Sequence, residues 1–176
     1  GGSRIRGSVA RNDAPLAHVD IGLNDATGAK MSYYLRYSAE VEAVDCRRDV
    51  QSLVGSMMLH QTLPAAQAKK LPLSVTGTGG YGTPRGKQFV VVRLYGPWGG
   101  SIEDVRLEGR LLDGEIRVNR LDGRPVALVP VLVSGPEQVP LTWRMTTGEG
   151  QSGPVRLRMT PGVEPGGADE ILPSSC

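Results

Sequence analysis

The stretch MSYYLRYSAEV, residues 31–41, alternates between apolar and polar side chains, and this pattern decides the fold class. Its odd positions are all apolar or aromatic, whereas its even positions include Ser32, Arg36, Ser38 and Glu40. Successive side chains on a β-strand point to opposite faces, so a period of two predicts a strand with one buried and one solvated face. An α-helix would scatter the same residues around its surface.

The same period recurs in three other parts of the chain, at residues 50–60, 139–146 and 155–160. In the first of these the alternation is less clean, and Gly55 falls on the expected inner side. A glycine inside a strand indicates a bulge or the close approach of another backbone. Residues 31–41, 50–60, 139–146 and 155–160 are therefore predicted to be half-buried strands.

Two further segments are continuous apolar runs, FVVVRLY at residues 89–95 and VALVPVLV at residues 126–133. Runs of this kind predict strands that are buried on both faces. Pro130 has no N–H to donate, so the second strand is expected to lie at a sheet edge or to carry a bulge there.

Turn signals separate these runs at short intervals. Asp113-Gly114 and Asp122-Gly123 both stand between extended runs, and such pairs favour hairpins because they tolerate positive φ. One helix is expected near residues 64–71, starting with Pro64 and ending before Pro72. The prediction is an all-β fold, an antiparallel β-sandwich of about seven to ten strands, immunoglobulin-like or fibronectin-like.

A single sandwich domain is expected over residues 1–161, followed by an extended C-terminal tail over residues 162–176. The chain has 176 residues, enough for one domain with a core of its own. Lys and Arg number 20 against 18 Asp and Glu, and this net charge of +2 argues against a nucleic-acid-binding domain. No apolar run reaches about 18 residues, so no membrane span is expected within the chain.

No arrangement of residues for catalysis, metal binding or cofactor binding stands out, so no catalytic residue, metal or cofactor is predicted. The stretch GTGGYG at residues 77–82 matches a nucleotide-binding glycine pattern. That pattern requires a helix directly after it, whereas Pro84 and Gly86 follow here. We interpret the stretch as a flexible connection between strands.

Three residues form the candidate ligand surface: Tyr81 in the glycine-rich loop, Arg85 after it, and Trp98 in the turn Gly96–Gly100. Aromatic side chains on exposed loops are typical of surfaces that bind sugars or proteins. The alternative is that the two rings fold back to cover the open ends of the sandwich. The two loops flank a single strand, so they leave its opposite ends and need not meet.

The two cysteines, Cys46 and Cys176, are too few for a structural zinc site, and they form no C-x-x-C motif. They either form one disulfide that ties the C-terminus to the body of the domain or remain two free thiols. The residues alone leave both alternatives open.

Several blocks occur in a characteristic order, and the first, GLNDATGAKMSYYL at residues 22–35, is the most specific. It is followed by blocks at residues 53–60, 79–84 and 122–126, so that the matches span roughly residues 19–145. In these blocks the chain resembles the C-terminal region of a bacterial domain-of-unknown-function family, number four-zero-one-two, which is found mainly in actinobacteria.

The resemblance implies a membrane-anchored envelope protein with an N-terminal transmembrane helix and an external body. The family's more N-terminal segment has no counterpart here, so the chain would be an excised domain. The family offers no catalytic residue to carry over. Its setting outside the cell is oxidising, and this implies a disulfide between Cys46 and Cys176.

The function expected from these observations is a non-catalytic extracellular interaction or spacer domain of an actinobacterial cell-envelope protein. One alternative is a module that binds cell-surface polysaccharide through Tyr81, Arg85 and Trp98. Another is an enzyme acting on cell-wall glycans with carboxylates from different strands. The expected partners are a cell-surface polysaccharide or another envelope protein, with no nucleic acid, and with membrane contact only through a segment outside this chain.

Overall fold

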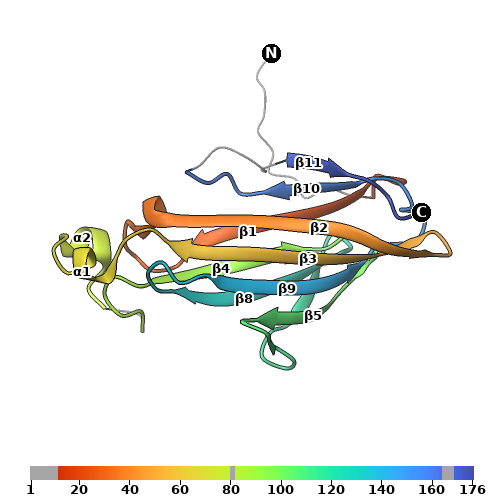
Figure 1. Ribbon diagram of the computed structural model, residues 1–176. Coiled ribbons are helices and arrows are strands. Elements are labelled where there is room, and N and C mark those ends of the chain that lie inside the picture. Colours follow the sequence, from red (N-terminus) through yellow and green to blue (C-terminus); the bar gives the residue numbers. More distant parts are fainter. Residues whose placement is uncertain (1–11, 80–81, 164–168) are drawn as a thin grey trace, which may run out of the picture.

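The computed structural model describes residues 12–79, 82–163 and 169–176, and these residues form a sandwich of two β-sheets (Figure 1). The six-stranded sheet has the order β11-β10-β1-β4-β8-β7, with β1 (Ala17–Asp25), β4 (Gln88–Tyr95), β7 (Val118–Leu121), β8 (Arg124–Val133), β10 (Val155–Met159) and β11 (Asp169–Leu172). The five-stranded sheet has the order β2-β3-β9-β5-β6, with β2 (Leu35–Arg47), β3 (Val50–Gln61), β5 (Ser101–Leu107), β6 (Arg110–Leu111) and β9 (Val139–Thr146).

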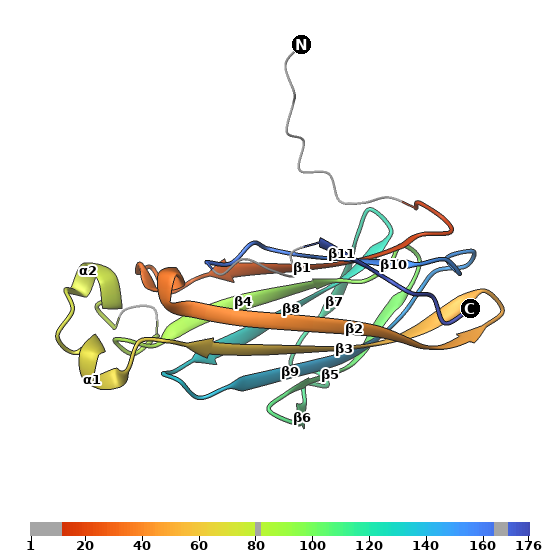
Figure 2. The same ribbon diagram turned by 45° about the horizontal axis from the view of Figure 1, so that its top comes forward.

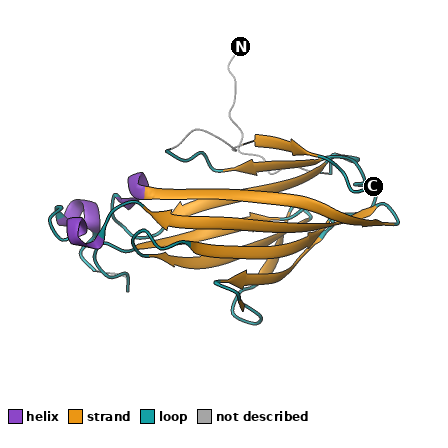
Figure 3. Ribbon diagram, in the orientation of Figure 1, coloured by secondary structure: helices purple, strands orange, loops and turns teal. Residues whose placement is uncertain are grey.

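The predicted all-β sandwich is confirmed. The described residues contain eleven strands, one more than the upper end of the expected range. Neighbouring strands pair antiparallel except for β1 and β10, which run parallel. The long strands run the length of the sandwich and give it its elongated shape (Figure 3).

The core lies between the two sheets and is built from the inward residues of the alternating strands. Leu53, Met57 and Leu59 on β3 face it, as the period of two predicts. Leu141, Trp143 and Met145 on β9 do the same, while Val155 and Leu157 come from β10 in the opposite sheet. Burying apolar surface at about 25 cal/mol per Å² makes this shared interior the main source of stability.

Residues 31–34 depart from the prediction, because the strand expected from Met31 onward begins only at Leu35. Met31–Tyr34 forms a short 3-10 helix, η1, that turns the chain into β2. Met31 is buried in a small cluster with Leu63 and Ala68, outside the main core. The apolar residues at 31 and 33 thus extend the alternating pattern into a segment that is not a strand. Tyr33, predicted to be buried, is exposed.

The two apolar runs form strands as predicted, but neither is buried on both faces. In β8 the even positions Leu128, Pro130 and Leu132 are exposed, while the odd positions Val129 and Val131 are buried. The reason is that a two-layer sandwich covers only one face of each sheet. Pro130 lies beyond the last pair between β7 and β8, so β8 is an edge there, as its missing N–H predicts.

One of the two predicted Asp-Gly hairpins is confirmed. Asp122 and Gly123 both have positive φ, 48° and 82°, and connect the paired strands β7 and β8. Asp113-Gly114 instead follows β6 in one sheet and precedes β7 in the other, so it crosses between the sheets. The hairpin between β2 and β3 turns at Arg48-Asp49, with φ of 52° and 61°, although no glycine signals it.

The helix expected near residues 64–71 is present as a single turn, α1 (Ala65–Ala68), and Pro72 precedes a second turn, α2 (Leu73–Thr76). Both lie at the end of the sandwich opposite the C-terminus in each view (Figures 1 and 2). Part of the expected tail, residues 162–176, belongs to the sheet, since β11 pairs with β10 from Asp169 to Leu172.

Candidate functional site

A surface groove of about 550 Å³ is associated with the five-stranded sheet. It crosses β2, β3, β9 and β5 and reaches β11 beyond the edge of that sheet. The outward or edge residues that line it are Glu40, Glu42, Val54, Ser56, Thr142, Arg144, Asp104, Glu170 and Leu172. Every one of them comes from a strand, so the five-stranded sheet together with β11 at the edge of the other sheet sets the shape of the groove.

Strand register explains how residues far apart in the sequence meet here. Glu42 pairs with Val54, and Val54 pairs with Arg144. In the neighbouring outward row, Glu40 pairs with Ser56, which in turn pairs with Thr142. Residues of the row between them, including Gly55 and Trp143, are buried on the core side. The groove therefore has two walls of side chains from three adjacent strands.

Asp104 stands at the β5 end of the groove because the strand carries a bulge. The pairing of β5 with β9 shifts register between Glu103 and Arg106, and Asp104 has a φ of 48°. Arg106 Nε donates a hydrogen bond to Asp104 Oδ1 at 2.8 Å, and Arg144 Nε lies 3.7 Å from Asp104 Oδ2. Bulges redirect side chains in this way, and this one anchors a carboxylate between two guanidinium groups.

The groove carries net negative charge. Its lining contains four carboxylates and one guanidinium, that of Arg144. Within the described part of the chain, Glu40, Glu42 and Glu170 form no ion pair. The same residues contain no group of three His, Cys, Asp or Glu side chains placed to hold a metal ion. The acidic residues thus line the depression without converging on one point.

Gly55 lies in the middle of the sheet, on the floor of the groove between the two outward rows, and makes room for Trp143. A Cβ atom at Gly55 would stand 2.2 Å from Trp143 Cε2, well inside van der Waals contact. The glycine therefore accommodates an aromatic side chain, whereas the sequence predicted a bulge or a neighbouring backbone. The pairing of β3 with β9 runs without interruption through this position.

The residues predicted as a ligand surface are not brought together where they are described. Arg85 donates to Thr76 Oγ1 at 3.1 Å and to the Leu71 carbonyl at 2.7 Å, so its guanidinium ties the helical segment to the loop before β4. Trp98 lies past the other end of β4, where its ring occupies the space above Gly123. Since β4 has eight residues, about 23 Å separates the two ends. Tyr81 lies outside the described residues.

Trp98 is 37% exposed, so its ring is neither free of the body nor fully buried. A Cβ atom at Gly123 would stand 2.4 Å from Trp98 Nε1, so the indole lies close against the turn between β7 and β8 in space that only a glycine leaves open. This position of Trp98 corresponds to the second of the two expectations for the loop aromatics, in which the ring folds back and covers an end of the sandwich.

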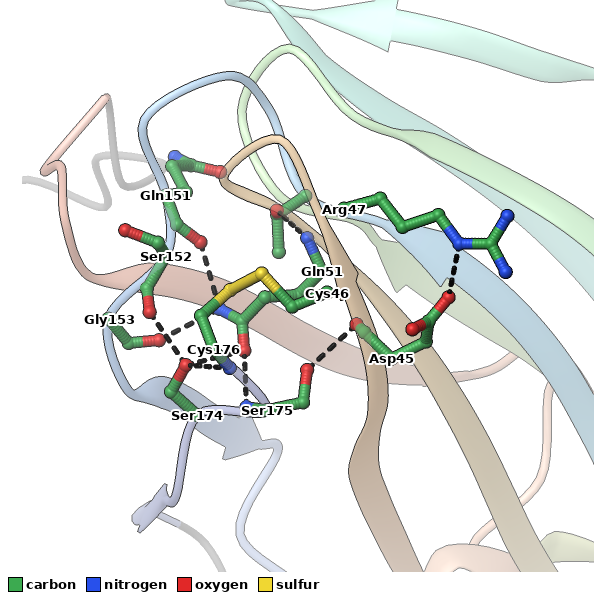
Figure 4. The surroundings of a disulfide bond; sticks show 11 residues. Asp45, Cys46, Arg47, Gln51, Gln151, Ser152, Gly153, Ser174, Ser175 and Cys176 are labelled. Atoms are coloured by element: carbon green, nitrogen blue, oxygen red, sulfur yellow. Dashed lines mark hydrogen bonds and ion pairs between the residues drawn. A yellow bond between two sulfur atoms is a disulfide. The ribbon is translucent and has the colours of Figure 1, made fainter.

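A disulfide joins Cys46 on β2 to Cys176, the last residue of the chain (Figure 4). It indicates that the protein folds in a non-reducing environment. The predicted bridge is therefore present, across a sequence separation of 130 residues.

Gln51 organises the backbone around this disulfide, although it was not among the residues predicted to form a site. Its buried side chain donates from Nε2 to the carbonyls of Gln151 and Gly153, both at 2.8 Å. Its Oε1 accepts from the Ser175 N–H and the Ser174 hydroxyl, both at 3.0 Å (Figure 4). The available signal was a polar residue at an inward position of an alternating strand.

A second depression of about 300 Å³ lies where η1 enters β2, and it is lined in part by Tyr33, Tyr37 and Val163. Tyr33 is 65% exposed, and its ring stands at 88° to that of Tyr34 with centroids 5.3 Å apart. The hydroxyl of Tyr37 donates to the Thr160 carbonyl at 2.9 Å, and burial raises the pKa of this phenol. This depression combines an exposed aromatic face with hydroxyl groups.

Comparison with models of known protein families, with curated proteins and with solved structures found no match. The resemblance to family four-zero-one-two therefore stays a prediction. Among the described residues, none of the helices has the length and apolar character needed to span a membrane.

Proposed function

We propose that the chain is a non-catalytic interaction domain of an extracellular envelope protein and that it binds its partner through the groove on the five-stranded sheet. The observation that carries this proposal is the groove itself. It is a wide depression on the outward face of the sheet, and Glu40, Glu42 and Glu170 on its lining have no ion-pair partner among the described residues.

The rigidity of the surroundings supports a binding role. The groove side chains project from paired strands, whose backbone is ordered before a partner arrives, and this reduces the backbone entropy lost on binding. The disulfide supports placement outside the cell, where such bonds persist. The envelope setting is the one that the family resemblance implies.

Blocking the groove tests the proposal. Ser56 is exposed on a wall of the groove, so Ser56→Trp would fill the depression without entering the core. Asn119→Trp is the matched control, since Asn119 is exposed on β7 in the other sheet. The immobilised domain is exposed to cell-envelope extract from the encoding organism, and the retained components are quantified.

We expect a component that wild type and Asn119→Trp retain and that Ser56→Trp loses. Retention that is equal in both variants would place the interaction on another surface and contradict the proposal. Retention of nothing by the wild-type domain would favour a spacer.

A second candidate function is the binding of cell-surface polysaccharide, and the exposed ring of Tyr33 favours it. A pyranose ring can pack its apolar face against an aromatic side chain while its hydroxyls bind nearby polar groups. Tyr33→Ala should then reduce retention on insoluble wall polysaccharide while Trp98→Ala leaves it unchanged. If Trp98→Ala reduces retention and Tyr33→Ala does not, the polysaccharide site is the loop surface predicted from the sequence.

The enzyme alternative requires two carboxyl groups in one cleft. Glu40 and Glu42 both line the groove, and outward residues two apart on a strand are about 6.6 Å apart at Cα. Glycosidases need the two carboxyl groups about 5–9.5 Å apart, so the enzyme alternative requires the Glu40 and Glu42 side chains to adopt that spacing across the groove. Release of reducing sugar from wall glycan by the wild-type domain, and its loss in Glu42→Gln, would replace the interaction proposal by this one.

A further inference from the structure

Resting on the proposed function, we infer that the groove binds an extended protein segment rich in lysine and arginine. The partner is identified by charge and shape together. Glu40, Glu42 and Glu170 supply unpaired carboxylates at the β2 and β11 end, while Asp104 at the β5 end is already paired with Arg106 and Arg144. A segment with basic side chains complements this lining, whereas an acidic segment is repelled by it.

The apolar part of the lining favours long basic side chains over a small cation. Val54 and Leu172 are partly exposed in the groove beside the glutamates. Lysine and arginine bury their methylene stems on apolar surface and extend the charged group beyond it. Val54 pairs directly with Glu42, so such a surface and a carboxylate lie side by side on neighbouring strands.

The spacing of the carboxylates argues against a metal ion as the occupant. No three acidic groups in the described part of the chain converge at metal-binding distance. Glu40 and Glu42 stand in different rows, on opposite walls of the groove, with the row of Gly55 between them. A guanidinium or ammonium group on a flexible stem spans such a gap, while a bare ion reaches only ligands that surround it closely.

The dimensions fit a short stretch of extended chain. The groove crosses three gaps between the four strands from β2 to β5. At about 4.8 Å per gap this is about 14 Å, the length of about four residues of extended peptide. Basic residues at the β2 end would meet Glu40, Glu42 and Glu170, whereas the β5 end, where Asp104 is already paired with Arg106 and Arg144, adds no free carboxylate.

Fluorescence anisotropy with three labelled hexapeptides tests the inference. One peptide alternates arginine with alanine, one alternates glutamate with alanine, and one alternates serine with alanine. The protein variants are wild type, the double variant Glu40→Gln/Glu42→Gln, and the control Glu149→Gln, whose carboxylate is exposed in the loop after β9. The glutamines keep the shape of the groove and remove only charge, and thermal unfolding checks that all three proteins fold alike.

We expect the arginine peptide to bind wild type and Glu149→Gln with the same Kd and to bind the double variant at least tenfold more weakly. Its affinity should fall as salt is raised, because the carboxylates are solvent-accessible. The glutamate and serine peptides should bind at least tenfold more weakly than the arginine peptide. Equal Kd values for the double variant and the control, or equal binding of the serine peptide, would overturn the inference.

The two proposals fail in different ways. If no peptide binds while Ser56→Trp still abolishes retention of an envelope component, the groove is an interaction site for a partner of other chemistry. If retention does not depend on Ser56 but the arginine peptide binds in the predicted way, the groove has the inferred chemistry and the envelope partner uses another surface.

Discussion

The guanidinium of Arg124, which is entirely buried, forms an ion pair with the carboxylate of Asp20 across the six-stranded sheet. Arg124 also donates to the carbonyls of His18 and Gly96, both at 2.8 Å, and of Tyr95 at 3.1 Å. Asp20 accepts a second ion pair from Arg158 on β10. One buried side chain from the start of β8 thus joins the ends of β4 and β1, and every charge in the group has a partner.

Removing Arg124 should therefore destabilise the domain strongly. Arg124→Met keeps much of the volume but leaves the carbonyls of His18 and Gly96 without this donor, and breaking a buried pair costs about 3–5 kcal/mol. Arg158→Met should cost less, since Arg158 is partly exposed. Urea unfolding followed by circular dichroism measures both. Equal effects would show that burial does not set the contribution of these pairs.

Reduction of the disulfide should lower the free energy of unfolding. Closing a loop with a sequence separation of 130 residues contributes about 5 kcal/mol in the chain-entropy model. Cys46→Ser/Cys176→Ser should match the reduced wild-type protein in urea unfolding. Thiol titration of the denatured, unreduced protein should find no free thiol, and a result of two thiols per chain would contradict the pairing.

Gly55→Ala should destabilise the sheet behind the groove, because the added methyl group would overlap the Trp143 ring. Overpacking of this kind costs about 1–3 kcal/mol. The double variant Gly55→Ala/Trp143→Leu should lose less stability than the sum of the two single variants, since the smaller side chain makes room for the methyl group. Strict additivity in a double-mutant cycle would contradict the proposed contact.

Acid should weaken the attachment of β11. Arg156 on β10 hydrogen bonds to Asp169 and lowers the pKa of that carboxyl below its ordinary value of 3.8. The contribution of this pair is therefore present above pH 3.8 and is lost as the pH falls through the lowered pKa of the folded state. An NMR titration of the Asp169 carboxyl carbon should give a lower midpoint in wild type than in Arg156→Gln. Identical midpoints would show that the pair does not form in solution.

The strands were predictable from local sequence wherever one face is buried and the other is wet. Leu53, Met57 and Leu59 follow the period, and so does Gln51, whose inward position leads to the hydrogen bonds beside the disulfide. The same period wrongly predicted a strand at Met31–Tyr34. A side chain such as Met31 can be buried in a separate small cluster as well as in the main core, so its apolar character does not require a strand.

The candidate groove was beyond sequence reasoning for a different reason. Glu42, Val54 and Arg144 meet only through strand pairing between segments that are up to about 100 residues apart. Nothing near Glu42 in the sequence indicates which residue will stand beside it. The local sequence signal for binding was the pair of aromatic residues on loops. That signal predicted a ligand surface that includes Trp98, which lies at an end of the sandwich and not in the groove.

The sequence by itself determined the alternating strands, their buried faces and the hairpin at Asp122-Gly123, because alternation and backbone preference act between residues a few positions apart. Tertiary structure decided which strands are neighbours, that Cys46 meets Cys176, and that carboxylates from β2, β5 and β11 share one groove. The physical reason is that strand order and register depend on packing two sheets against each other, and this balance of contacts involves the whole chain at once.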